Sequence, residues 1–78
     1  MNERVGEVLK RVRKGIEPHL GRTDLVSDGI LDSLDIMRLI VELEGEFGIE
    51  IPPEDVLSDN FESVNAIIAL IDKCRAQA

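Results

Sequence analysis

The chain has little cysteine, few aromatic residues and few basic residues, and each shortage excludes a class of function. Its single Cys and single His cannot form a disulfide framework or a Cys/His zinc site. With a formal net charge of −7 and no Trp or Tyr, it lacks the basic surface and the stacking side chains of a nucleic-acid-binding protein. It also has no apolar run of about 18 residues, so no membrane span is expected.

The length allows one small domain with a thin core. There are 78 residues, and 44% of them are apolar, which is enough for a folded protein. The first ten residues are charged and helix-periodic, unlike a signal peptide, so the cytoplasm is the expected compartment. We expect residues 1–78 to form a single domain and the protein to be a monomer.

The acidic residues are concentrated in one part of the chain. Residues 1–22 carry a net charge of +3, whereas residues 23–72 hold thirteen acidic side chains and one basic side chain, Arg38. Attraction between the two parts is one interpretation of this asymmetry. The other is an anionic face that attracts basic partner proteins.

The spacing of the apolar residues predicts an all-α fold. The predicted helices cover residues 2–16, 32–47, 53–57 and a last segment after the cap Ser63. Pro18 closes the first helix, and Gly48 stands where a glycine commonly ends a helix. The sequence therefore predicts a small four-helix bundle with three main helices, a short third helix and a long loop after the first helix.

On a helical wheel, the second helix has two apolar faces, whereas a bundle core needs only one. The core-facing side chains are Ile36, Leu39, Ile40, Leu43 and Phe47, flanked by the acidic Asp35, Glu42 and Glu46. Leu34, Met37 and Val41 point away from the centre of the core face and form a candidate contact patch for a partner. For Met37, at the edge of this patch, packing within the bundle is the alternative.

Ser33 stands at the junction of the long loop and the second helix. Unpaired backbone N–H groups and the helix dipole favour a phosphate there, so its hydroxyl is well placed to carry a phosphodiester. An N-cap role alone would also explain a serine at this position. It is not a hydrolase nucleophile of the usual kind, because no Gly-x-Ser-x-Gly motif surrounds it and His19 lies in a different loop. We find no catalytic set and expect no enzyme.

Two further patterns give weaker hypotheses. Residues 24–35 partly match a calcium loop, but Val26 occupies a position that requires a ligand oxygen, and Asp35 replaces the final bidentate Glu. We therefore expect no specific metal site. Cys74 lies between two basic residues but has no base beside it, so we expect an inert thiol.

The run DGILDSLDIMRLIVELEGEFGIEIP, residues 28–52, closely resembles the acyl carrier protein family. The shared marks are Asp32-Ser33-Leu34, the leucine-rich helix that follows, and Ile49-Glu50-Ile51-Pro52. The resemblance implies a single carrier domain in which Ser33 is the attachment point of 4′-phosphopantetheine. A phosphopantetheinyl transferase would add the group from coenzyme A, and Asp32 would assist the metal of that transferase.

The implied function is that of a free-standing carrier, which holds acyl or aminoacyl groups as thioesters on this arm. It would deliver them to enzymes of fatty-acid, lipid, polyketide or related biosynthesis. The implied partners are the transferase and acyl- or aminoacyl-loading and processing enzymes with basic docking surfaces. A sheltered acyl chain would lie between the second helix and its neighbours.

The resemblance also implies a partner-facing side on the second helix. Its residues in this chain are Leu34, Asp35, Met37, Arg38, Val41 and Glu42. Arg38 departs from the family, because fatty-acid carriers usually have an acidic residue there, and Glu42 replaces a small one. These departures favour a specialised carrier, including the D-alanyl type, over a housekeeping fatty-acid role. An unmodified helical interaction module or a weak calcium-binding domain is the alternative from another class.

Overall fold

The computed structural model describes residues 2–77, and within that range every regular element is helical. The elements are the α-helices α1 (Asn2–Val12), α2 (Ser33–Phe47) and α3 (Val64–Ala76), and the 3-10 turns η1 (Glu17–His19), η2 (Pro53–Asp55) and η3 (Ser58–Phe61). The predicted all-α bundle is confirmed, with two consecutive 3-10 turns in place of the short third helix. Met1 and Ala78, the ends of the predicted domain, lie outside the described residues.

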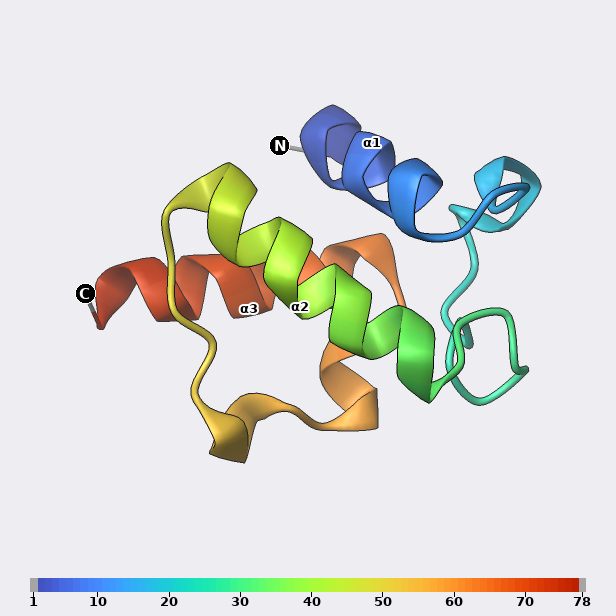
Figure 1. Cartoon of the computed structure of the whole chain (residues 1–78). Helices are drawn as coiled ribbons and strands as arrows, with labels where there is room; N and C mark the ends of the chain where they lie inside the picture. Colours follow the sequence, from blue (N-terminus) through green and yellow to red (C-terminus); the bar gives the residue numbers. More distant parts are fainter. Residues whose placement is uncertain (1, 78) are drawn as a thin grey trace.

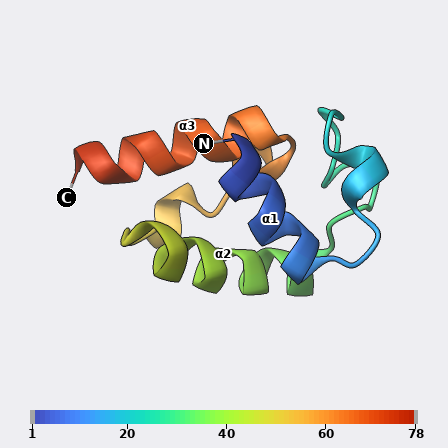
Figure 2. The same cartoon turned by 90° about the horizontal axis from the view of Figure 1, so that it is seen from above.

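Helix α1 covers one side of the α2–α3 pair, and η2 and η3 lie on the other side (Figure 1; Figure 2). The exposed face of α2 therefore has α1 along one edge and the 3-10 segment along the other. None of the helices in residues 2–77 combines the length and the hydropathy that crossing a bilayer requires.

Helix α1 is shorter than its apolar stripe predicts. It ends at Val12 rather than at Ile16, because the chain adopts a left-handed conformation at Gly15, with φ of 87°. The stripe nevertheless continues in space, since Ile16 is buried and its N–H donates to the Arg13 carbonyl at 3.2 Å. The periodicity therefore predicted burial correctly, while the predicted end of the helix was wrong.

Helix α2 begins and ends where the sequence predicts. Asp32 is its N-cap, and Gly48, with φ of 63°, ends it with an N–H that donates to the Glu44 carbonyl at 3.0 Å. The predicted core face is confirmed: its side chains Leu39, Leu43 and Phe47 are buried, and Ile36 and Ile40 are half-buried.

Helix α3 holds the 3-10 segment in place. The Ser63 hydroxyl caps α3 by accepting from the Ala66 N–H at 3.0 Å, as the sequence predicts. Phe61, from η3, is fully buried in the core. Lys73 of α3 donates to the buried Asp55 carboxylate of η2 at 2.7 Å. These contacts fix the η2–η3 segment, which lies opposite the first half of α2.

Candidate functional site

Two aspartates build the N-terminus of α2. The Asp32 carboxylate accepts a hydrogen bond from the backbone N–H of Asp35 at 2.8 Å, and the Asp35 carboxylate accepts from the backbone N–H of Asp32 at 3.1 Å. This reciprocal capping box satisfies two backbone donors at the start of the helix. The bond from the Asp35 N–H lowers the pKa of this exposed Asp32 carboxylate below its usual value, because it stabilises the charged form.

Ser33 is the first residue of α2 and not its cap. The capping role, which would alone have explained a serine at this junction, belongs to Asp32. Ser33 is exposed, and it lies at the end of a helix of 15 residues, where the first backbone N–H groups and the helix dipole favour an anion. Its position therefore suits the attachment of a phosphate-linked group.

The other serines are placed differently. The Ser27 hydroxyl donates to the Glu62 carboxylate at 3.3 Å, and the Ser63 hydroxyl is used as the cap of α3. Ser58 begins a 3-10 turn of four residues, which is too short to present a helix terminus to a phosphate. Of the four serines, Ser33 is thus the one that is exposed and begins a long α-helix.

An apolar pocket opens beside Ser33, between α2 and the η2–η3 segment. Its volume is about 330 Å³, which lies at the lower end of the usual range for small-molecule sites. The apolar side chains around it belong to Val26, Ile36, Met37, Ile40, Val56, Leu57 and Phe61. The pocket can therefore shelter an apolar group that is held close to Ser33.

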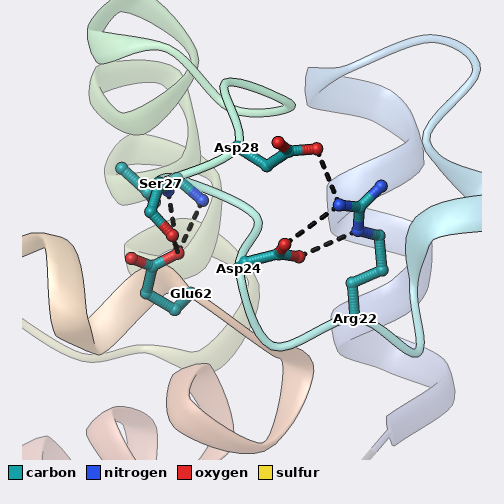
Figure 3. Close-up of polar contacts among 6 residues, drawn as sticks. Arg22, Asp24, Ser27, Asp28 and Glu62 are labelled. Atoms are coloured by element: carbon teal, nitrogen blue, oxygen red, sulfur yellow. Dashed lines mark hydrogen bonds and ion pairs between the residues drawn. The ribbon is translucent and has the colours of Figure 1, made fainter.

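Arg22 organises the loop that leads to Ser33. Its guanidinium donates to both Asp24 carboxylate oxygens, at 2.8 and 3.0 Å, and to Asp28 at 2.6 Å (Figure 3). Asp24 and Asp28 are two of the ligand positions in the calcium-loop pattern, and a third, Asp35, is used in the capping box. No group of three or more His, Cys, Asp or Glu within residues 2–77 is arranged to hold a metal ion. The carboxylates of the calcium-loop pattern thus belong to an ion-pair cluster around Arg22 and to the capping box of α2.

Glu62 joins the same loop to the start of α3. One of its carboxylate oxygens accepts from the N–H groups of Val26 and Ser27, at 2.8 and 3.0 Å (Figure 3). The hydrogen bond from the Ser27 N–H is the main cause that lowers the pKa of Glu62. The Leu25 N–H also donates to the Glu62 carbonyl, at 2.9 Å. The loop is therefore tied to the bundle close to Ser33.

Comparison with known proteins identifies the family of the chain. A family model described as "Phosphopantetheine attachment site" matches residues 3–71, which is most of the chain. The chain belongs to this phosphopantetheine carrier family. Members carry 4′-phosphopantetheine covalently on a serine, which agrees with an exposed serine at a helix N-terminus.

Two groups of relatives support the assignment. The carrier protein is 42% identical to the D-alanyl carrier protein of Lactococcus lactis subsp. cremoris over 50 residues, covering 64% of this chain and 63% of that relative. It is 34% identical to the acyl carrier protein of Sinorhizobium fredii over 80 residues, covering 92% of this chain and all of that relative. The chain thus spans less than two thirds of the D-alanyl carrier length. Both relatives are named as carriers, and no solved structure matches the chain.

The contact patch of the carrier protein is exposed, as the wheel predicts. Leu34, Met37 and Val41 are 56%, 64% and 66% exposed, and Arg38 beside them is exposed too. Met37 also reaches the edge of the apolar pocket. The side chains remain open to a partner along about two turns of α2.

Asp35 does not lie on the partner-facing side, and this prediction was wrong. Its side chain is only 8% exposed, because the capping box turns the carboxylate toward the start of the helix. The Arg13 guanidinium of the first loop lies 3.7 Å from the same carboxylate. Asp35 therefore stabilises the site from within and is not available to a docking enzyme.

Two acidic side chains of α2 are paired with arginines of α1, and these individual pairs were not predicted from the sequence. Glu42 lies 3.1 Å from Arg11, and Glu46 lies 3.2 Å from Arg4 and 3.4 Å from Arg11. Arg4 also lies over the ring of Phe47, 4.5 Å from its centroid. The net charge of +3 in the first 22 residues was the signal for these contacts in the sequence. The ion pairs confirm the predicted attraction between the basic and acidic parts of the chain.

Proposed function

We propose that Ser33 carries the phosphopantetheine arm of this carrier protein. The supporting observation is that Ser33 is exposed at the start of α2 while Asp32 performs the capping. When bound, the arm supplies a thiol on which cargo is held as a thioester. Ser33 would hold the phosphate of the arm at the start of α2, and the charged Asp32 carboxylate beside it would meet the metal of the phosphopantetheinyl transferase.

Intact-mass measurement tests the attachment. The protein is incubated with coenzyme A, Mg²⁺ and a broad-specificity phosphopantetheinyl transferase. We expect the wild type to gain one phosphopantetheine and Ser33→Ala to gain none. Ser58→Ala, on the opposite wall of the same pocket, is the matched control and should gain one. A gain that persists in Ser33→Ala would refute the proposal.

We further propose that the cargo is an acyl chain whose apolar end enters the pocket beside Ser33. The pocket is lined mainly by apolar side chains, and burial of each methylene group is worth about 0.8 kcal/mol. The relative that aligns over its whole length is named an acyl carrier protein. Fatty-acid, polyketide or specialised lipid biosynthesis in the cytoplasm would use such a carrier.

Thermal unfolding of the loaded protein tests this cargo. An octanoyl group should raise the melting temperature relative to an acetyl group, because the longer chain fills the pocket. Ile40→Asp, which places a charge in the pocket wall, should remove the difference between the two loaded forms. Equal melting temperatures in the wild type would contradict an acyl chain held in this pocket.

A D-alanyl cargo is the second candidate function. It is supported by the 42% identity to a D-alanyl carrier protein over the 50 residues that align. The mass of the species purified from the source organism distinguishes the two, because a D-alanyl group and an acyl chain add different masses to the same arm.

A further inference from the structure

A groove runs along the exposed face of α2, on the side away from the apolar pocket. Its floor is formed by Leu34, Met37 and Val41, and α1 contributes its far wall through Arg11. The groove has a volume of about 460 Å³. Exposed apolar side chains gathered in this way are typical of a surface that contacts a binding partner.

The carboxylates along this groove are already neutralised by α1. Glu42, the acidic residue in its wall, is held by Arg11, whose Nε donates to it at 3.1 Å. Glu46, one turn further, is held by both Arg4 and Arg11. Basic side chains of a partner would therefore compete with Arg4 and Arg11 for these carboxylates.

Arg38 lines the same groove, and its positive charge is unpaired within the described residues. It lies on α2 one turn after Leu34 and one turn before Glu42, and it is exposed. Each ion pair found within residues 2–77 involves other side chains, and Glu42 is paired with Arg11 rather than with Arg38. The groove therefore presents apolar floor residues beside an unpaired positive charge.

We infer that the enzyme that loads this carrier covers the groove with apolar side chains and places a carboxylate against Arg38. The inference rests on the proposed function, since it presumes a carrier that docks through α2. It replaces the expectation of a basic docking surface, because basic partner residues would face Arg38 and Arg11 across the interface, where like charges oppose binding. The net charge of −7 would then affect how fast the two proteins approach each other, and not the contacts within the groove.

Loading kinetics with charge variants test this inference. The probe is the enzyme of the source organism that loads the holo protein, purified by following the mass increase of the carrier. Arg38→Glu should raise the KM for the carrier by about tenfold or more and leave kcat nearly unchanged, because an attraction becomes a repulsion at the interface. Arg38→Gln should raise KM by a smaller factor.

Lys14→Glu is the matched control. It makes the same change in net charge, but Lys14 is exposed outside the groove, so KM should change less than about twofold. The melting temperatures of all variants establish that they fold. An unchanged or lowered KM for Arg38→Glu would overturn the inference while the proposed function stands. Failure of the wild type to accept phosphopantetheine on Ser33 would remove the proposed function, and this inference with it.

Discussion

Truncations on the two faces of α2 should have very different costs, and the structure sets both magnitudes. Leu39 is fully buried, whereas Val41, two residues later, is 66% exposed. Replacing a buried leucine by alanine removes its transfer free energy and leaves a cavity, which together cost about 2–5 kcal/mol. A domain of this size is stable by about 4–12 kcal/mol, so Leu39→Ala should remove a large share of the free energy of unfolding.

For Val41→Ala, the loss of apolar burial and the gain in helix propensity nearly cancel. Full burial of a valine is worth about 1.5–3 kcal/mol, and one third of Val41 is covered, so truncation loses about 0.5–1 kcal/mol. Alanine has the higher helix propensity, which returns about 0.5 kcal/mol. The net change should stay within about 0.5 kcal/mol, even though the same variant should weaken docking of the loading enzyme.

Urea and thermal unfolding followed by circular dichroism measure both variants, with loading kinetics on the same samples. For a domain of this size each kcal/mol corresponds to about 4–8 °C, so Leu39→Ala should lower Tm by about 8–40 °C and Val41→Ala by less than about 4 °C. Met37→Ala, 64% exposed, is the second surface variant. A loss above about 1.5 kcal/mol in Val41→Ala would show that this side chain belongs to the core and would refute the assignment of the patch.

Three further predictions follow from the backbone and from two titratable groups. Gly45→Ala should raise the free energy of unfolding by about 0.5–1 kcal/mol in urea titrations, because a Cβ there meets no atom within 4 Å and glycine weakens a helix interior; a loss would contradict this. Glu62→Gln should be less stable than the wild type at neutral pH. Because the folded pKa of Glu62 lies below its usual value of 4.5, the difference should persist above that pH and shrink as the pH falls through the lowered pKa in acid unfolding curves. Burial raises the pKa of the Cys74 thiol, so iodoacetamide should label it slowly in the native protein and rapidly in denaturant; rapid native labelling would contradict its burial.

Local signals in the sequence were sufficient for α2 and for its exposed patch. The N-cap Asp32 and the closing Gly48 act within a few residues of the helix ends, so their effect can be read from the chain itself. The angle of each side chain around a helix is equally local, and for this reason Leu34, Met37 and Val41 are exposed as the wheel predicts.

Tertiary contacts account for what the sequence did not reveal. The wheel fixed the angle of Asp35 but not the turn of its carboxylate toward the Asp32 N–H. The pairing of Glu42 with Arg11 depends on how α1 is placed against α2, which no local pattern records. The apolar pocket likewise needs the η2–η3 segment to be fixed against α3, partly through the contact of Lys73 with Asp55.

Mapping the modified residue by fragmentation mass spectrometry is the most direct test of the central claim. Trypsin cleaves after Arg22 and Arg38, so residues 23–38 form one peptide that contains Ser27 and Ser33, while Ser58 and Ser63 fall in the next peptide. We expect the holo protein to carry phosphopantetheine in the first peptide, with fragment ions that place it on Ser33. Phosphopantetheine on any other serine would contradict the claim.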